Sequence, residues 1–306
     1  MQVEPLNLPG VSETVRRRYL SHLTRIGVRR NWMRAGERIP SRDDRRNVIL
    51  SGLGGIGVLL TGCAGAPGDR RELDSESGRT FERADRDTRI IAHRGCADQY
   101  PENTILAVEQ SAPHVDMIEI DIQRCASGEL VVFHDDELDR LTEATGAVST
   151  TDWEKIRELT VLDSGESIPQ LSTLLEAVPA DTGVNIELKH VGMADDILAA
   201  ASGVDNQILY SSFSGEALRE LGELDEDLAL AYIFRDSPEI NLSIAADIGC
   251  VAVNPSVELV FGSDIVENAH SDGFDVNVWT VDDAETAAAL RETGVDGLIV
   301  DRWDIF

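Results

Sequence analysis

The segment Arg89-Ile90-Ile91-Ala92-His93-Arg94-Gly95 has the pattern of a short buried strand that ends in polar residues. Further apolar runs follow it at regular spacing, and we expect strands at 89–93, 117–123, 130–134, 184–188, 207–213, 228–234, 250–254, 275–281 and 297–300. Helical patterns lie between most of these runs, at 103–112, 170–178, 193–202, 214–222, 239–247, 257–271 and 283–293. Because strands and helices alternate, the pattern predicts an α/β fold with a parallel sheet.

One pair of predicted strands departs from this alternation. The runs 117–123 and 130–134 are joined by a segment short enough for a hairpin. Setting 130–134 aside as an antiparallel extra strand leaves eight parallel strands, the number that closes a TIM (β/α)8 barrel. A doubly wound open sheet is the alternative, but no glycine-rich phosphate loop follows the first strand. We therefore predict a TIM barrel with a short extra hairpin strand after its second strand.

The charge of the chain is strongly negative and unevenly distributed. The 306 residues carry a formal net charge of -29, with an isoelectric point near 4.4, which argues against nucleic acid as a partner. Residues 1–62 hold 11 arginines, no lysine and 5 acidic residues, whereas the remainder holds 16 basic and 51 acidic residues. Such an acidic surface, with two lysines in the whole chain, resembles the surfaces of proteins from extreme halophiles. High salt screens this self-repulsion, so we expect stability to depend on salt.

The first sixty residues resemble an export signal. Arg45-Arg46 precede the uncharged run Val48–Leu60, which has the length of a signal-peptide core and is too short to span a bilayer. The run ends in Leu60-Thr61-Gly62-Cys63, which resembles a lipobox. We therefore expect residues 1–62 to be a leader and twin-arginine-type lipoprotein signal, 63–88 a flexible tether and 89–306 the barrel. This organisation predicts export and a lipid anchor at Cys63 on the outer face of the cytoplasmic membrane.

Carboxylates recur at a spacing of two on the predicted strands. Glu119 and Asp121 share one strand face, and Glu187 lies on the next parallel strand. Buried carboxylates on one face repel each other and lose hydration, which is costly unless a cation lies between them. Three such carboxylates form an all-oxygen site suited to Mg²⁺ or Ca²⁺ rather than zinc.

Histidines and cations fall at the same predicted strand ends. His93 and Arg94 end the first strand, His134 ends the extra strand, and Lys189 lies two residues after Glu187. Catalytic groups of TIM barrels lie at the carboxyl ends of the strands. A single histidine there is more often structural, and a single Glu-x-Asp pair often faces solvent. The convergence of all these groups favours a catalytic site.

The ordered motifs of residues 89–301 resemble the glycerophosphodiester phosphodiesterase family. The motifs are His93-Arg94-Gly95, Pro101-Glu102-Asn103-Thr104, Glu119-Ile120-Asp121, Val131-Val132-Phe133-His134-Asp135, Leu138-Asp139-Arg140-Leu141-Thr142, Ile186-Glu187-Leu188-Lys189, Ser211-Ser212-Phe213, the Trp279-Thr280 pair and the closing Gly297-Leu298-Ile299-Val300-Asp301. Each motif alone is weak, but their order along the chain is specific.

The resemblance implies a metal-dependent phosphodiesterase that releases glycerol phosphate and an alcohol from small-molecule glycerophosphodiesters. It implies one divalent cation, Mg²⁺ or Ca²⁺, bound by Glu119, Asp121 and Glu187. It implies an acid–base pair of His93 and His134. It implies substrate contacts from Arg94 and Lys189 to the phosphate, from Asn103 beside His93, and from Trp279 to the glycerol or the leaving group.

Two other functions compete with this interpretation. A phospholipase D-like or phosphoinositide-type phosphodiesterase would act on intact lipid, and a tether to the membrane would place it near that substrate. A non-enzymatic solute-binding lipoprotein would need neither two histidines nor three carboxylates. The segment 136–168 is short for its place after His134, and we expect it to leave an open pocket that admits bulky head groups. The sequence leaves open which histidine is the acid, the head group and the oligomeric state.

Overall fold

The structure is a computed structural model, and it describes residues 88–306. The predicted leader and signal at 1–62, the lipidation site Cys63 and the predicted tether up to residue 87 lie outside the described residues. These assignments therefore stay predictions. Within residues 88–306, no helix has the length and apolar character needed to cross a membrane.

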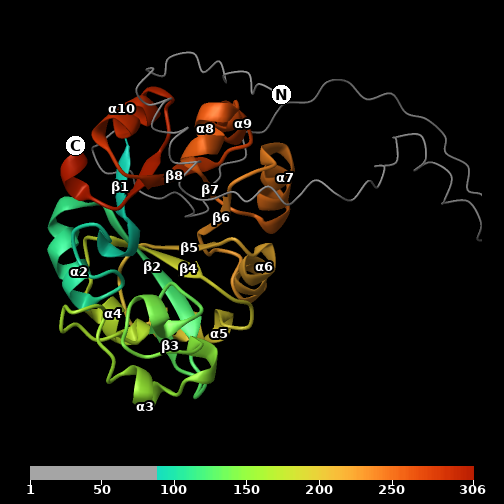
Figure 1. Cartoon of the computed structure of the whole chain (residues 1–306). Coiled ribbons are helices and arrows are strands. Elements are labelled where there is room, and N and C mark those ends of the chain that lie inside the picture. Colours follow the sequence, from blue (N-terminus) through green and yellow to red (C-terminus); the bar gives the residue numbers. More distant parts are fainter. Residues whose placement is uncertain (1–87) are drawn as a thin grey trace, which may run out of the picture. The chain divides into compact units, whose positions relative to one another are not determined.

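Eight parallel strands form a closed barrel (Figure 1). They are β1 (Arg89–Ala92), β2 (Met117–Arg124), β4 (Gly183–Leu188), β5 (Ile208–Ser212), β6 (Leu230–Phe234), β7 (Ala252–Pro255), β8 (Asp275–Val281) and β9 (Gly297–Val300). Each of these strands pairs with the next in chain order, and β1 pairs with both β9 and β2. Because this last pairing closes the sheet, the TIM barrel is confirmed and the open doubly wound sheet is excluded.

The extra strand is also confirmed. Strand β3 (Leu130–Val132) runs antiparallel to the last residues of β2, with Ile122 opposite Val132. The backbone N–H of Phe133 then donates to the carbonyl of Asp121 over 2.9 Å. This pairing brings the chain after β3 back to the level of Asp121, so His134 enters the barrel mouth beside the carboxylates.

Apolar side chains fill the barrel interior beneath the polar residues. The interior cluster consists of Ile91, Met117, Leu209, Ala231, Ala252 and Ile299. Met117 lies on the same face of β2 as Glu119 and Asp121, but nearer the start of the strand. The cluster therefore forms an apolar floor, and the carboxylates lie above it at the carboxyl end of the barrel.

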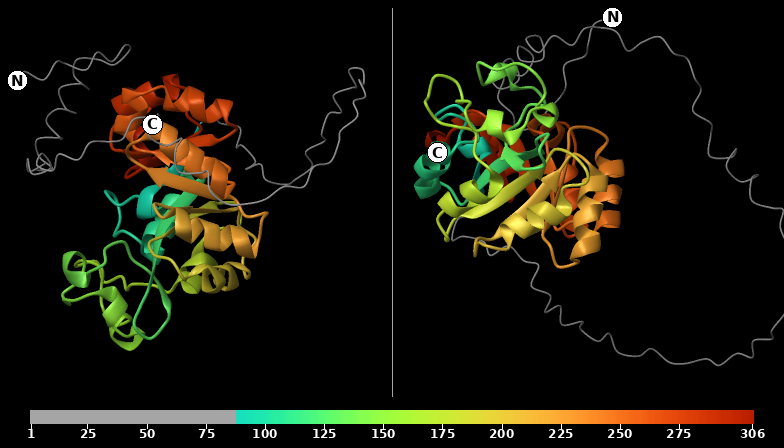
Figure 2. Two further views of the ribbon diagram at one scale, coloured as in Figure 1. Left: turned by 90° about the vertical axis from the view of Figure 1, so that its right-hand side faces the viewer. Right: turned by 90° about the horizontal axis from the view of Figure 1, so that it is seen from below.

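Helices surround the strands, as the two views of Figure 2 show. They are α2 (Ile105–Ser111), α4 (Leu171–Ala177), α5 (Ala194–Ala201), α6 (Gly215–Leu224), α7 (Pro238–Ile248), α8 (Val257–Gly262), α9 (Ile265–Ser271) and α10 (Ala284–Glu292). The single helix predicted at 257–271 is wrong, because the chain forms two helices there. Ser263 is fully extended, with φ -156° and ψ 171°, and its hydroxyl donates to the carbonyl of Leu259. This local bond competes with helix continuation.

The segment between β3 and α4 packs beside the barrel as an insertion, drawn in green in Figures 1 and 2. We call residues 136–168 the insertion. It contains three short helical segments, η3 (Leu138–Arg140), η4 (Val148–Thr150) and α3 (Trp153–Ile156). Its buried side chains form a separate hydrophobic cluster of Leu138, Leu141, Val148, Ile156, Val161 and Ile168 with Cys125, Val131 and Phe133. The insertion is therefore a packed element that holds its polar residues in place beside His134.

Candidate active site

Strand register brings the predicted carboxylates together. Asp121 of β2 lies directly opposite Glu187 of β4, and Glu119 lies one inward position below Asp121. One oxygen from each of the three carboxylates lies within 4.8 Å of the others. Their exposed fractions are only 2%, 1% and 8%. Three buried like charges at this spacing destabilise one another unless protons or cations compensate them.

The carboxylate cluster has the properties of a divalent-cation site. Oε1 of Glu119 is buried and has no hydrogen-bond partner among residues 88–306. Burial, followed by the charge of Asp121, raises the pKa of Glu119 to about 8. A divalent ion would give this oxygen a partner and offset the repulsion, and hard oxygen ligands suit Mg²⁺ or Ca²⁺. The residues present therefore fit such an ion.

Two cations border the carboxylates. The ammonium of Lys189 lies 2.7 Å from Oδ1 of Asp121 and 2.5 Å from Oε1 of Glu187. Nε of Arg94 lies 3.2 Å from Oδ2 of Asp121, and its Nη1 lies 2.8 Å from Oε1 of Glu102. Burial alone would raise the pKa of Asp121, but the charges of Lys189 and Arg94 outweigh it and hold that pKa well below its usual range. Asp121 is therefore the carboxylate that stays ionised.

Both predicted histidines are held by an aspartate through Nδ1. The distance from His93 to Oδ1 of Asp301 is 2.6 Å, and the distance from His134 to Oδ1 of Asp135 is also 2.6 Å. Burial opposes the charged form of His93, yet the hydrogen bond to Asp301 and the nearby carboxylates raise its pKa above 6.5. Burial dominates for His134 and lowers its pKa below 6.5. Among residues 88–306, no hydrogen bond involves the second ring nitrogen of either histidine.

Asn103 holds Asp121 through two hydrogen bonds. Its amide nitrogen donates to Oδ2 of Asp121 over 2.9 Å, and its Oδ1 accepts the backbone N–H of Asp121 over 3.2 Å. No hydrogen bond joins Asn103 to His93 among the described residues. Asn103 therefore clamps Asp121, and its expected contact with substrate beside His93 stays a prediction.

The site opens into two neighbouring cavities that share His134 and Lys189. The inner cavity, of about 130 Å³, contains His93, Arg94, Glu119 and Glu187 and is walled on its far side by Phe213 and Trp279. Trp279, the predicted pocket residue, donates its indole N–H to the carbonyl of Asn254 over 2.8 Å, and Phe213 meets its ring edge-on at 5.4 Å. This wall is rigid and aromatic.

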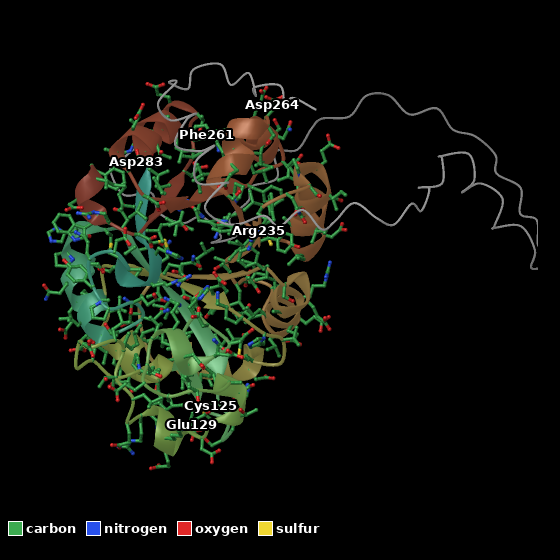
Figure 3. All side chains as sticks on the ribbon, viewed as in Figure 1. Cys125, Glu129, Arg235, Phe261, Asp264 and Asp283 are labelled. Atoms are coloured by element: carbon green, nitrogen blue, oxygen red, sulfur yellow. The ribbon has the colours of Figure 1, made fainter. Side chains whose placement is uncertain are left out.

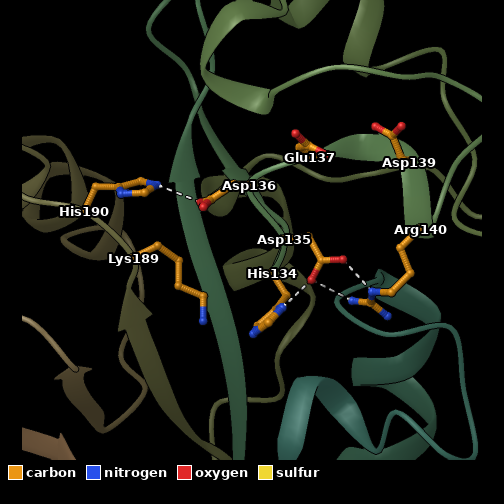
Figure 4. Close-up of a pocket in the computed structure, with 8 residues that line it drawn as sticks. All are labelled: His134, Asp135, Asp136, Glu137, Asp139, Arg140, Lys189 and His190. Atoms are coloured by element: carbon orange, nitrogen blue, oxygen red, sulfur yellow. Dashed lines mark hydrogen bonds and ion pairs between the residues drawn. The ribbon is translucent and has the colours of Figure 1, made fainter. Parts of the chain in front are cut away.

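The outer cavity, of about 600 Å³, lies between the barrel and the insertion (Figure 4). The figure shows Asp135 between His134 and Arg140, and the insertion residue Asp136 facing His190. The lining residues are His134, Asp135, Asp136, Glu137, Asp139, Arg140, Lys189 and His190. The open pocket expected beside 136–168 is present.

The search for functional residues at predicted strand ends did not identify several residues of the site. Glu102 accepts from Arg94 and Arg140, and Asp135 and Asp301 hold the histidines. All of these lie inside the motifs quoted above, but nothing in the sequence assigned them partners. Arg235, which follows β6 and lines the inner cavity, carried no signal at all.

Comparison with known proteins agrees with this geometry. A model of the Glycerophosphoryl diester phosphodiesterase family matches residues 93–305. A glycerophosphodiester phosphodiesterase of Caldanaerobacter subterraneus subsp. tengcongensis is 29% identical over 229 residues, which cover 70% of this chain and 94% of that protein. A phosphodiesterase of Oleispira antarctica, solved in complex with the product sn-glycerol-3-phosphate, superimposes with a TM-score of 0.64 at 27% identity, covering 70% of this chain and 92% of that one. A glycerophosphodiester phosphodiesterase of Agrobacterium tumefaciens superimposes with a TM-score of 0.63 at 27% identity, covering 72% of this chain and 98% of that one. The chain belongs to the glycerophosphodiester phosphodiesterase family and is a phosphoric diester hydrolase.

Proposed function

We propose that the chain hydrolyses glycerophosphodiesters to a glycerol phosphate and an alcohol, with one Mg²⁺ or Ca²⁺ held by Glu119, Asp121 and Glu187. The observation that carries this proposal is the convergence of three buried carboxylates, two cations and two histidines on one cavity. The Oleispira antarctica relative was solved with sn-glycerol-3-phosphate, which supports that compound as the product here. Because the chain belongs to a family of enzymes, the alternative of a non-enzymatic solute-binding lipoprotein is excluded.

The residues of the cavity divide the chemistry among them. The cation, when bound, would offset the negative charge that builds on the phosphoryl oxygens. Arg94 and Lys189 line the same cavity and would hold the phosphate with charge-assisted hydrogen bonds. His93 and His134 would act as the acid–base pair, one taking the proton of the attacking hydroxyl and the other protonating the leaving alcohol. Asn103, through its clamp on Asp121, would fix the direction of that carboxylate.

The first test is hydrolysis of glycerophosphocholine by the full chain in high salt. We expect release of glycerol phosphate that EDTA abolishes and that Mg²⁺ or Ca²⁺ restores. His93→Asn removes one acid–base group and is expected to lower kcat by a factor of about 10² to 10⁴. His270→Asn is the matched control, because His270 makes a similar 2.7 Å contact with Asp296 but lines neither cavity.

The outcomes separate the competing substrates. A folded protein that releases nothing from glycerophosphocholine with either ion would refute the proposal. Activity on intact phospholipid, with none on the deacylated compound, would establish the lipid-cleaving alternative instead.

We also propose that the protein is exported and anchored by a lipid on Cys63 at the outer face of the cytoplasmic membrane. The support is the arginine pair, the uncharged run and the Leu60-Thr61-Gly62-Cys63 motif. Cys63→Ser is expected to move the protein from the membrane fraction to the soluble fraction. Equal membrane association of both proteins, or peptides from residues 34–62 in the mature protein, would refute the anchor.

A further inference from the structure

Arg235 differs from the other cations of the inner cavity in having no carboxylate partner. It is exposed, follows β6 directly and is labelled in Figure 3. Its guanidinium carbon lies 5.4 Å from the ring centre of Phe213 and 5.6 Å from that of Trp279. Arg94 and Lys189 each contact two carboxylates, whereas no ion pair joins Arg235 to any residue of 88–306. The two aromatic rings therefore hold this cation in place of an acidic partner.

The chemistry of this arrangement favours an anionic ligand. The chain has 56 acidic and 27 basic residues, so an arginine at a cavity without an acidic partner is unexpected. A cation–π contact supplies no oxygen acceptor to the guanidinium, so the N–H donors of Arg235 can still bind an anion. That edge matches the oxygens of a carboxylate or a phosphate.

Asn254 supplies a second, independent donor in the same cavity. It is fully buried on β7, yet its amide nitrogen has no hydrogen-bond partner among the described residues. Its orientation is set by Asn277, whose amide nitrogen donates to Oδ1 of Asn254 over 3.0 Å. A buried donor without an acceptor is destabilising, and it points to a ligand oxygen.

The barrel topology separates these donors from the metal-binding carboxylates. In the order β1-β9-β8-β7-β6-β5-β4-β2, strand β7 lies four strands from β2 in either direction, and β6 lies four strands from β1. Arg235 and Asn254 therefore stand across the cavity from His93, Glu119 and Asp121. A group bound to them is distinct from the phosphodiester held at the carboxylates.

We propose that Arg235 and Asn254 form a second anion subsite. It binds a phosphate or carboxylate that is attached to one of the two alcohol groups esterified in the phosphodiester. The inference rests on the proposed function and narrows its substrate class to glycerophosphodiesters with a further anionic group. Arg235 makes a charge-assisted contact to that group, Asn254 donates a hydrogen bond to it, and Phe213 and Trp279 hold the guanidinium in position.

A matched pair of substrates tests the subsite. Glycerophosphoglycerol and the same compound with a terminal phosphate monoester differ only in the second anion. Removal of a charged hydrogen-bond partner typically reduces binding by about 10- to 100-fold. Arg235→Gln is therefore expected to lower kcat/KM for the phosphorylated substrate, relative to the unphosphorylated one, by about 10- to 100-fold. Arg291→Gln is the control, because Arg291 also lies over an aromatic ring, Phe306 at 4.4 Å, but lines neither cavity. We expect Arg235→Lys to retain part of the ratio, because it keeps the charge and loses the planar edge.

Two results would overturn the subsite. An unchanged ratio in Arg235→Gln would show that the guanidinium does not contact the second anion. Equal losses on both substrates would place Arg235 on the phosphodiester itself. Calorimetric binding of both compounds keeps this test separate from the proposed function. If the wild type hydrolyses neither compound, the proposed function fails. The subsite is then tested by binding alone: the phosphorylated compound should bind about tenfold more tightly, and Arg235→Gln should remove that difference.

Discussion

Arg140 links the insertion to His134, and we expect its replacement by glutamine to impair both stability and turnover. Its guanidinium contacts Glu102 through Nη1 at 2.8 Å and Nη2 at 2.9 Å, and Asp135 through Nε at 2.5 Å and Nη2 at 3.0 Å. Asp135 in turn holds Nδ1 of His134. Arg140 is thus a positioning residue that acts on His134 through Asp135.

The magnitude follows from the pKa of Asp135. Burial opposes ionisation, but the hydrogen bonds from Arg140 and His134 outweigh it and lower the pKa from 3.8 to about 2. A difference of this size corresponds to roughly 2 kcal/mol before screening. The side chain of Arg140 is 47% exposed, so solvent screening reduces the expected loss in Arg140→Gln to about 1 kcal/mol.

The sign of the pH dependence follows from the same shift. A carboxyl with a lowered folded-state pKa stabilises the fold above its unfolded pKa of 3.8, and this contribution is lost as pH falls toward about 2. The difference in unfolding free energy between wild type and Arg140→Gln should therefore be full at pH 5 to 7 and shrink below about pH 4. Urea unfolding at pH 7 and at pH 3 measures both values.

Turnover provides the second measurement. Without Arg140, Asp135 loses its orientation and His134 loses a fixed ring position, so kcat should fall by about tenfold while KM changes less. Arg157→Gln is the control, because its 51% exposed side chain contacts Glu154 and Glu158 only at 3.9 Å. The reasoning is refuted by an unchanged kcat, or by a stability difference that is as large at pH 3 as at pH 7.

Three further expectations concern packing, thiols and salt. Gly297→Ala would place a Cβ 2.3 Å from Oδ1 of Asn277, so unfolding free energy should fall by about 1–3 kcal/mol, whereas Gly262→Ala, with no atom within 4 Å, should cost little. Burial raises the pKa values of Cys96 and Cys250 to about 12, so iodoacetamide at pH 8 should label them only after unfolding; labelling of the native protein would contradict this. The net charge of -29 should make the fold more stable in molar KCl than in dilute buffer, and a denaturation midpoint indifferent to salt would show that the charges are too dispersed to matter.

The barrel was predictable because its strands are short apolar runs separated by amphipathic helices. All nine predicted strands exist, with bounds within two residues at every end. The break in the helix predicted at 257–271 was missed because apolar residues recur on both sides of Ser263, so the hydrophobic pattern does not register the extended residue. The core of the insertion was also missed, since its apolar residues follow neither a strand nor a helix period.

Strand geometry predicted the part of the site that lies on neighbouring strands, and it did not predict the contacts made by loop residues. Glu119, Asp121 and Glu187 converge because residues two apart share a strand face and neighbouring strands lie in register. The partner of Asn103 was not predictable, because it depends on a loop residue with a positive φ of 59° that turns its amide toward Asp121. Arg235 and Asn254 line the same cavity from separate positions in the chain, and no local pattern connects them.

The charges around the carboxylates favour the divalent cation that we propose for this site. Glu119, Asp121 and Glu187 carry three negative charges when ionised, and Arg94 and Lys189 carry two positive ones, which leaves a net charge opposed to a phosphodiester anion. The pKa of about 8 for Glu119 means that, without an ion, this carboxyl holds a proton near neutral pH. A divalent cation held by the three ionised carboxylates would turn the local charge to plus one, which matches the single negative charge of the substrate. A proton and the proposed cation would therefore compete for Glu119, and we expect the cation-bound state to attract the phosphodiester.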